Sequence, residues 1–392
     1  MTLLVQKFGG TSVGSIDRIE AVADRVMKTY QQGHQIVVVL SAMAGETNRL
    51  LGLAKQIDEI PTPRELDVLL SAGEQVSIAL LAMALNRRGI KAQSLTADQV
   101  TIRTDNVFNN ASITEVETKR LTALLEQGDV VVVAGFQGRD SDNNITTLGR
   151  GGSDTTAVAI ASALNATECQ IFTDVDGVYS TDPRLVPDAR RLNVIHFEHM
   201  RTMASKGAKV LQLQSVEYAL QHSVPLRVLS SFDEGEGTLV NFDIASTPSI
   251  VGIAILGNQA LLEVELSKDE LQRQLSIFGV AVWSVTAKAD STQIVASNDD
   301  LARLRLVLDE KMRHIGDVST LSMIGNDVLE YADEIRIFLS EAGIIVHHKQ
   351  QQTDCLSFLI DKDNHKLAVD IIHKRFVVEQ QSLDNLPLLA IY

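Results

Sequence analysis

The stretch Thr147-Leu148-Gly149-Arg150-Gly151-Gly152-Ser153-Asp154 follows an apolar segment, 130–134, and precedes a run of small residues, 155–164. The apolar segment predicts a buried strand, and the small residues predict a helix. The glycines between them let the backbone approach a ligand without Cβ collisions. This strand–loop–helix unit decides the fold class.

The chemistry of this loop favours an anion. Ser153 and Asp154 are good N-cap residues, so unpaired N–H groups and the positive end of a helix should face the loop. Arg150 adds a planar, permanently charged group in the same place. Phosphate or carboxylate would suit this site. A tight turn without a ligand is the alternative that the loop alone leaves open.

The same kind of unit occurs earlier in the chain. Residues 3–8 and 36–40 predict buried strands, and small or polar residues follow each of them. Continuous apolar strands that alternate with helices predict an α/β fold with a mainly parallel sheet sandwiched by helices. Ligands of such sheets bind beyond the carboxyl ends of the strands, which places Lys7, Ser41 and Thr47 near a ligand.

Other segments complete the N-terminal part of the chain. A long helix is predicted over 64–88, where Glu74 lies beside a glycine; an ordinary helix-surface carboxylate is the alternative for Glu74. Residues 170–184 predict a short strand and a polar loop that could hold a nucleobase and ribose. Residues 226–229 predict the last strand of the domain, and a boundary is expected near 244–249.

The C-terminal third contains an internal repeat. Residues 269–282 align without gaps on residues 333–346, each as a helix, a glycine and a strand. A further strand and a further helix follow in each case, the helices being predicted over 299–312 and 364–376. The region therefore predicts two copies of a β-α-β-β-α-type unit, for which ligand sensing or oligomerisation is the expected role.

Composition limits the classes of function. The 392 residues include 35 basic and 50 acidic side chains, and the net charge of −15 argues against general binding of nucleic acid or anionic membranes. Cys169 and Cys355 lie in apolar stretches and should be buried free thiols. No apolar run approaches the roughly 18 residues of a membrane span and no signal peptide is apparent, so a cytoplasmic protein is expected.

Phosphoryl transfer fits these features best. The sequence has neither a P-loop nor a Rossmann fingerprint, and its adjacent His347 and His348 should point to opposite faces of a strand rather than bind a metal. Phosphoryl transfer needs alignment and charge neutralisation more than covalent help from the protein. A carboxylate acceptor, with a reference pKa of about 4, is ionised at pH 7 and needs no general base.

Three motifs, in this order, resemble those of the aspartate kinase (aspartokinase) family in the amino-acid kinase superfamily. They are KFGGTS at 7–12, GRGGSD at 149–154 and TDVDGVYSTDPR at 173–184. The resemblance implies phosphoryl transfer from MgATP to the side-chain carboxylate of L-aspartate, giving 4-phospho-L-aspartate. That reaction begins the pathway to lysine, threonine and methionine.

The resemblance also implies a domain organisation. Residues 1–243 would form the amino-acid kinase catalytic domain, and residues 250–392 would form a regulatory pair of α+β ACT domains. The ACT domains would cover approximately 260–315 and 316–380, intertwined through strands at 250–257 and 386–392. The size resembles that of monofunctional members of the family.

Roles for particular residues follow from the resemblance. Lys7, Gly10, Asp154 and Lys209 would be catalytic. Aspartate would contact Ser41, Thr47, Glu74, Arg150 and Ser153, with Glu74 on its α-amino group and Arg150 on its α-carboxylate. ATP would contact Lys7, Phe8, Gly9, Gly10, Thr173, Asp174, Tyr179, Ser180, Thr181, Asp182, Pro183, Arg184, Lys209 and Val210. Mg²⁺ would bridge the phosphates with few protein ligands.

The chain departs from the family pattern in its ACT units. The Pro-Gly pairs of the family are absent near 267–270 and 327–333. We therefore expect the ACT pair mainly to hold a homodimer or higher oligomer, with weak or altered binding of a lysine or threonine effector. The alternative functions are a related kinase of another carboxylate, such as glutamate or acetylglutamate, and a catalytically dead amino-acid sensor.

Overall fold

The computed structural model describes residues 2–242, 248–277 and 282–379, and the chain divides into two compact units. The N-terminal unit comprises Met1–Val178, Arg191–Ala204 and Lys209–Ala245. The C-terminal unit comprises Tyr179–Arg190, Ser205–Ala208 and Ser246–Tyr392. Two short early segments thus belong with the C-terminal unit. The predicted boundary at 244–249 falls mostly on residues outside the described part of the chain.

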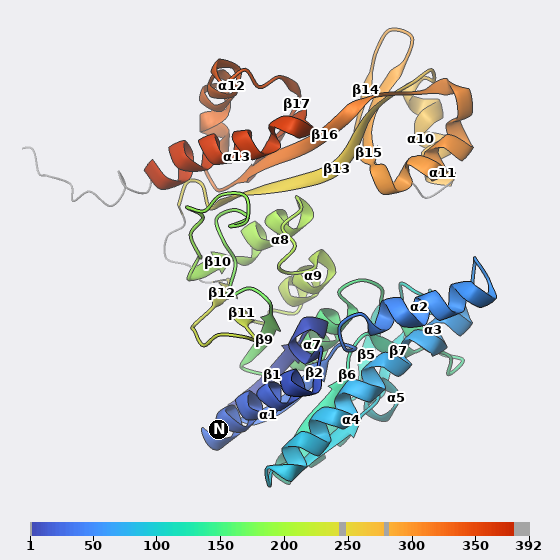
Figure 1. The fold of residues 1–392 in the computed structure, drawn as a ribbon, viewed down its shortest axis with the longest axis vertical. Helices are drawn as coiled ribbons and strands as arrows, with labels where there is room; N and C mark the ends of the chain where they lie inside the picture. Colours follow the sequence, from blue (N-terminus) through green and yellow to red (C-terminus); the bar gives the residue numbers. More distant parts are fainter. Residues whose placement is uncertain (1, 243–247, 278–281, 380–392) are drawn as a thin grey trace, which may run out of the picture. The chain divides into compact units, whose positions relative to one another are not determined.

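The N-terminal unit is built on an eight-stranded sheet (Figure 1). Six strands are mutually parallel, and β12 and β10 extend one edge. The mainly parallel α/β fold is therefore confirmed. In spatial order the strands are β10 (Val194–His196), β12 (Thr238–Asn241), β11 (Leu226–Ser230), β9 (Glu168–Thr173), β1 (Leu3–Phe8), β2 (Gln35–Leu40), β6 (Val130–Ala134) and β3 (Ala92–Leu95).

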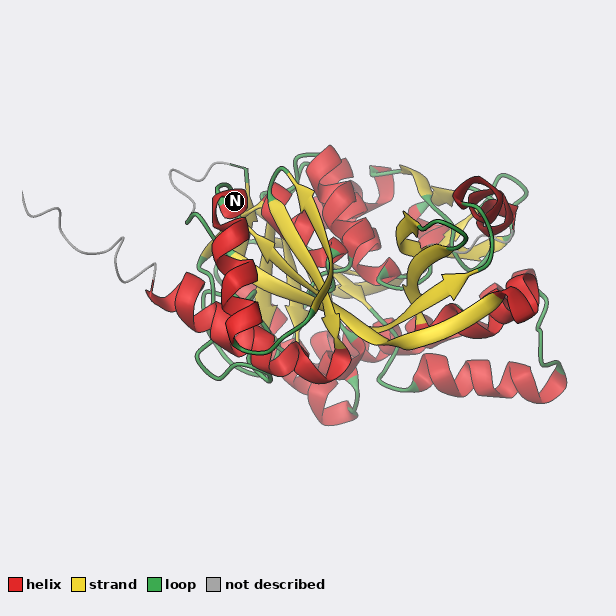
Figure 2. Ribbon diagram, turned by 90° about the horizontal axis from the view of Figure 1, so that it is seen from above, coloured by secondary structure: helices red, strands yellow, loops and turns green. Residues whose placement is uncertain are grey.

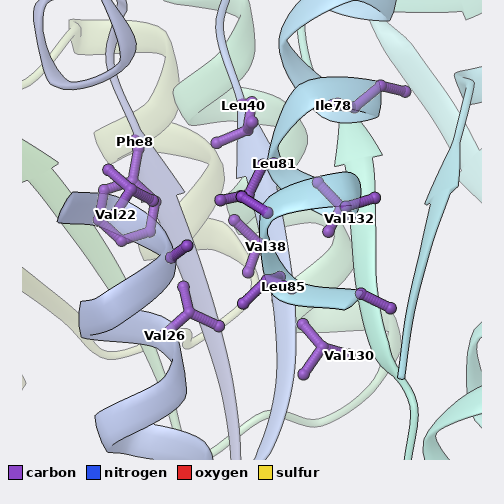
Figure 3. Close-up of a cluster of buried hydrophobic side chains, with 14 of the residues drawn as sticks. Phe8, Val22, Val26, Val38, Leu40, Ile78, Leu81, Leu85, Val130 and Val132 are labelled. Atoms are coloured by element: carbon purple, nitrogen blue, oxygen red, sulfur yellow. The ribbon is translucent and has the colours of Figure 1, made fainter. Parts of the chain in front are cut away.

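The central strands are apolar throughout because both of their faces are covered. One face carries Phe8, Val38, Leu40 and Val132, which pack with side chains of the two flanking helices α1 and α4 (Figure 3). The alternate residues of the same strands, such as Val39, are fully buried on the opposite face. Figure 2, coloured by secondary structure, shows helices beside the strands.

The helices of the N-terminal unit differ locally from the prediction. They are α1 (Ile16–Gln31), α2 (Glu46–Ile57), α3 (Pro63–Leu70), α4 (Ala72–Arg87), α5 (Ala97–Val100), α6 (Lys119–Glu126), α7 (Gly152–Ala163), α8 (Phe197–Ser205) and α9 (Leu213–Gln221). The single helix predicted over 64–88 is divided at Ser71. The N-cap role predicted for Ser153 and Asp154 is wrong. Gly151 caps α7 in a left-handed conformation (φ 75°), which a glycine adopts without strain, so the helix starts earlier.

One helical stretch, Pro63–Arg87, has the length and composition of a membrane span, with a mean hydropathy of 1.8 over its 18-residue apolar window. More than half of that window (56%) is buried inside the protein. Its residues Ile78, Leu81 and Leu85 belong to the core beneath α1 (Figure 3). A helix that is apolar for this reason is a core helix.

A smaller, four-stranded sheet completes the N-terminal unit. Its order is β5 (Ile113–Val116), β4 (Ile102–Thr104), β7 (Gln137–Arg139) and β8 (Ile145–Thr147). β8 ends at Thr147, two residues before the Gly149–Gly152 loop begins. The strand predicted over 226–229 is not the last of the domain, because the short β12 follows it in the large sheet.

The C-terminal unit is a six-stranded antiparallel sheet flanked by helices (Figure 1). The sheet order is β14 (Val282–Ala287), β15 (Thr292–Ser297), β13 (Gly252–Val264), β16 (Met312–Ile324), β18 (Cys355–Asp361) and β17 (Val346–Gln352). The long strands β13 and β16 run through its centre. Helices α10 (Lys268–Ile277) and α11 (Leu301–Leu308) lie beside one end, and α12 (Ala332–Glu341) and α13 (His365–Ile372) lie beside the other.

The two long strands are shared between two cores, which agrees with the predicted repeat. Leu262 in the second half of β13 packs with α10 and α11. Ile253 in its first half packs with α12 and α13 instead. The segment Gly252–Leu256 pairs with Thr320–Ile324 of the second repeat. The other exchanged strand, predicted at 386–392, lies outside the described residues.

The α-helical parts of the two predicted helices after the inner strands are shorter than expected. The helix predicted over 299–312 is α-helical only over Leu301–Leu308, because Met312 already belongs to β16. The helix predicted over 364–376 is α-helical from His365 to Ile372 and continues as a π-helical segment, His373–Glu379.

Candidate active site

Three neighbouring parallel strands end at the same edge of the large sheet. The register places the carboxyl ends of β1, β2 and β6 side by side. Hydrogen bonds continue this pairing past the strands, since the Ser41 N–H donates to the Phe8 carbonyl (3.1 Å) and the Gly135 N–H donates to the Leu40 carbonyl (2.9 Å). The loops that leave these strands are therefore fixed relative to one another.

Lys7 and Asp154 form a buried ion pair at this edge. Lys7 lies near the end of β1, and Asp154 lies in the first turn of α7. The Lys7 Nζ is 2.5 Å from the Asp154 Oδ1, and their side chains are 11% and 8% exposed. A Cβ on Gly9 would come within 3.4 Å of the same Nζ. The carboxylate orients the ammonium, and the glycine keeps the space beside it open.

Glu74 lies in the first turn of α4 and is 3% exposed. Its Oε1 accepts a hydrogen bond from the Ala42 N–H (3.0 Å), whereas its buried Oε2 has no partner among the described residues. Burial raises the pKa of Glu74 to about 7, although the backbone hydrogen bond from Ala42 acts against this. A buried carboxylate oxygen without a donor is suited to receive a cationic group from a ligand.

Close backbone contacts bring Glu74 near the loop that follows β1 and contains Gly9 and Gly10. A Cβ on Gly73 would lie 2.8 Å from the Ala42 Cβ, and a Cβ on Gly10 would lie 3.0 Å from the Ala42 carbonyl oxygen. Ser77 in the next turn of α4 donates to the Ser41 carbonyl (2.8 Å). Gly10 and Glu74 therefore both lie against Ala42, at the exit of β2.

The glycine-rich loop leads from β8 to α7 and carries Arg150. Gly149 and Gly151 both have left-handed φ angles, 73° and 75°, which explains why glycines occupy these positions. Arg150 between them is exposed, and the structure gives it no ion pair within the part of the chain it describes. Ser153 is buried, and a Cβ on Gly135 would lie 2.7 Å from the Ser153 Cβ.

Two residues of this region were not singled out by the sequence analysis. Phe136, directly after Gly135, has a left-handed φ of 70°, which is unusual for a bulky residue. Asp67 in α3 is 0% exposed and bonds to two segments far away in the sequence. The only signal for Phe136 is the glycine before it. Asp67 had no such signal in the sequence, because a single Asp in an amphipathic helix pattern predicts a surface residue.

The predicted aspartate residues Ser41 and Thr47 differ in their surroundings. Ser41 is half-buried at the exit of β2, and its N–H and carbonyl are both hydrogen-bonded. Thr47 lies exposed in α2. The structure thus places Ser41 near Glu74 through Ala42 and Ser77, while Thr47 lies exposed in the helix that follows β2.

The predicted ATP residues are divided between the two units. Thr173 ends β9 and Asp174 follows it in the N-terminal unit, where the Thr173 hydroxyl donates to the Asp174 carboxylate (3.2 Å). Lys209 is exposed and Val210 half-buried in the same unit. The Phe8 side chain stacks on Phe172 in the core, with ring centroids 4.5 Å apart, so only its backbone faces the site.

The other predicted ATP residues lie in the Tyr179–Arg190 segment of the C-terminal unit. Asp182 binds Arg184 through both carboxylate oxygens (3.0 and 2.7 Å) and accepts from the Arg184 N–H (2.9 Å). Ser180 donates and accepts backbone hydrogen bonds with Arg190 and Ile253, and its hydroxyl lies 2.8 Å from the His373 Nε2. Tyr179, Thr181 and Pro183 complete this segment, which is therefore anchored to the C-terminal core.

The remaining predictions concern structural residues. Cys169 and Cys355 are buried free thiols, as expected. His347 and His348 make separate contacts, the first with the Asp361 carboxylate (2.6 Å) and the second with the edge of Trp283. Among the described residues no three His, Cys, Asp or Glu side chains lie together as a metal site.

The sequence matches the Amino acid kinase family model over residues 2–230. It is 60% identical to an aspartate kinase of Pseudomonas putida over 405 aligned positions, which cover 96% of this chain and 98% of that protein. It is 46% identical to an aspartokinase of Pseudomonas aeruginosa, with 97% and 98% of the two chains covered.

Solved structures give the same result. The fold resembles that of Escherichia coli aspartokinase III in complex with aspartate and ADP (R-state), with a TM-score of 0.80, 27% identity, and 95% and 99% of the two chains covered. It also resembles the same enzyme in complex with lysine and aspartate (T-state), with a TM-score of 0.77 and 27% identity over 96% and 99% of the two chains.

Proposed function

The chain belongs to the aspartate kinase family, and we propose that Lys7, Glu74 and Arg150 direct the transfer of the γ-phosphoryl group of ATP to the side-chain carboxylate of L-aspartate. The observation that supports these roles is that the buried Lys7–Asp154 pair and the buried Glu74 carboxylate lie at the ends of the paired strands β1 and β2. The product is 4-phospho-L-aspartate.

Aspartate recognition requires one anionic and one cationic group. The unpartnered Oε2 of Glu74 would accept hydrogen bonds from the α-ammonium group, which also removes the cost of burying this carboxylate alone. Arg150 would hold the α-carboxylate with two parallel hydrogen bonds. Ser41, Thr47 and Ser153 would complete the pocket. The β-carboxylate is then left free to react.

Phosphoryl transfer itself needs little covalent help. A β-carboxylate oxygen attacks the γ-phosphorus while the bond to the bridging oxygen of ADP breaks, and no proton has to be removed from the ionised acceptor. Lys7 would neutralise charge on the transferring group, and Asp154 would hold Lys7 in place. The N–H groups of Gly9 and Gly10 would bind phosphate oxygens.

The nucleotide would be held by the residues after β9, by the Tyr179–Arg184 segment, and by Lys209 and Val210. Mg²⁺, which the kinase fold implies, suits a site in which the phosphates supply most ligands, because the described residues form no cluster of three metal-binding side chains. When bound, it would neutralise phosphate charge. Lys209 would add a further positive charge to the phosphates.

Regulation and assembly form a separate part of the proposal. The lysine in the T-state complex of the E. coli enzyme makes lysine the first effector to test, followed by threonine. Because the ACT units here lack the Pro-Gly pairs, we infer weak or altered effector binding and a main role in holding a dimer. We also propose that the enzyme is located in the cytoplasm.

A hydroxamate-trapping assay with MgATP tests the reaction and the acceptor together. We expect aspartyl hydroxamate with L-aspartate and far less product with L-glutamate, because the extra methylene displaces one end of the acceptor from the Glu74–Arg150 pair. Arg150→Ala should raise the KM for aspartate at least about tenfold, as expected for a lost bidentate charge pair, with the KM for ATP nearly unchanged. Equal use of both amino acids would contradict the proposed roles.

A further inference from the structure

Asp67 is a buried carboxylate that the proposed reaction does not use. It lies in α3, is 0% exposed, and its hydrogen-bond partners are backbone N–H groups and a hydroxyl rather than a cation. Burial raises the pKa of Asp67, and the bonds from Thr147 and Asn109 act in the opposite direction. A charge so far from solvent is retained only when donors surround it closely.

The donors come from two segments that border the glycine-rich loop. The Asn109 N–H lies 3.1 and 3.0 Å from the two carboxylate oxygens of Asp67. The Thr147 N–H donates to Oδ2 (2.9 Å) and the Thr147 hydroxyl donates to Oδ1 (2.6 Å). Thr147 is the last residue of β8, three positions before Arg150. One side chain thus joins α3 to both segments.

These two segments also contact each other and the loop. The Ala111 N–H donates to the Thr147 carbonyl (2.9 Å). A Cβ on Gly149 would lie 2.8 Å from the Asn110 Oδ1 and 3.2 Å from the Asn109 carbonyl oxygen. The backbone before Arg150 is therefore enclosed by the segment that Asp67 holds. Loss of Asp67 would leave three donors, two of them buried, without their acceptor at the base of the loop.

We propose that Asp67 is a positioning residue for aspartate binding: it fixes the base of the Gly149–Gly152 loop, so that Arg150 is held where it meets the α-carboxylate. The inference rests on the role proposed above for Arg150. Asp67 does not touch the substrate, and it acts through geometry rather than through its charge. A displacement of a clamping group by about 1 Å can cost up to about a hundredfold in activity.

The test compares steady-state KM values of the full-length enzyme. Asp67→Ala should raise the KM for aspartate at least about tenfold and leave the KM for ATP within about twofold, because only the aspartate clamp loses its support. Asp67→Asn should restore a near-normal KM, since its amide oxygen can accept both N–H groups and its NH₂ can donate to the Thr147 hydroxyl. Equal effects of the two variants would show that charge matters and would overturn the inference.

A second pair of variants covers the case in which Asp67→Ala does not fold. Thr147→Val removes one bond to Asp67, and Thr146→Val is the matched control, because the neighbouring buried Thr146 hydroxyl bonds to Thr104 instead (2.6 Å). We expect a higher KM for aspartate only in Thr147→Val. The same KM in both would refute the positioning role.

The double variant Asp67→Ala/Arg150→Ala separates the two proposals. We expect it to bind aspartate no worse than Arg150→Ala alone, because positioning a missing guanidinium has no effect. Additive effects would overturn the inference while the clamp role of Arg150 stands. An unchanged KM in Arg150→Ala would instead refute the clamp, and the inference would fall with it.

Discussion

Aspartate binding should release protons near neutral pH, and Glu74 is the source. The free site holds this carboxyl with a pKa of about 7, because it is buried and only the Ala42 N–H donates to it. The α-ammonium group of aspartate would stabilise the ionised form, so binding lowers this pKa. The fraction protonated before binding is then about one half at pH 7, about 0.9 at pH 6 and about 0.1 at pH 8.

Two measurable numbers follow from this fraction. Saturating the site should release about 0.5 proton per chain at pH 7, and the dissociation constant for aspartate should be about tenfold larger at pH 6 than at pH 8. Isothermal titration calorimetry in phosphate and in Tris measures the release, since the two buffers differ in ionisation enthalpy. A nonhydrolysable ATP analogue keeps the nucleotide site filled.

Controls make the assignment specific. Glu74→Gln should abolish the release, whereas Glu234→Gln should retain it, because the hydrogen bond from Lys28 lowers the pKa of Glu234 and keeps it ionised. The same enthalpy in both buffers at pH 7, or an unchanged release from Glu74→Gln, would refute the argument. The raised pKa of Glu74 also makes the free energy of unfolding depend on pH. Its contribution to stability is fully present below about pH 4.5 and is lost as the pH rises through about 7.

Three further outcomes are expected. Asp154→Asn leaves Lys7 without its charged partner at 2.5 Å, so kcat should fall at least about tenfold with smaller changes in both KM values, and unchanged kcat would exclude an orienting role. Gly135→Ala places a Cβ 2.7 Å from the Ser153 Cβ, so urea unfolding should show a loss of about 1–3 kcal/mol together with a higher KM for aspartate, and wild-type stability would contradict the close packing. Burial raises the pKa of the Cys169 thiol, so a disulfide reagent should modify it only after denaturation, and rapid labelling of the native protein would contradict its burial.

The parts of the site that could be predicted from sequence share a local cause. Lys7 lies one residue before the end of β1 and Ser41 directly follows β2, and a parallel sheet gathers such strand ends at one edge. The glycines at 149, 151 and 152 indicate a loop whose backbone needs residues without a Cβ atom. These signals lie within a few residues of the feature they indicate.

The parts that could not be predicted depend on distant partners. Asp67 is satisfied by Asn109 and Thr147, which lie 42 and 80 positions away in the chain. The division of α3 from α4 at Ser71 is set by tertiary packing, where the Gln137 amide donates to the Ser71 carbonyl (2.9 Å). β12 spans four residues, too few for its period to stand out.

The membership of Tyr179–Arg190 in the C-terminal unit has a consequence for biosynthesis. Val186 packs in the same core as Phe376, which the ribosome adds 376 − 186 = 190 residues later. At roughly 5–20 residues per second, that interval lasts about 10–40 s. During this interval the strands of the large sheet can already pair. The segment expected to hold the nucleotide cannot yet pack, because the later residues of its core have not been synthesised. A nascent chain would therefore acquire its sheet well before it acquires its catalytic competence.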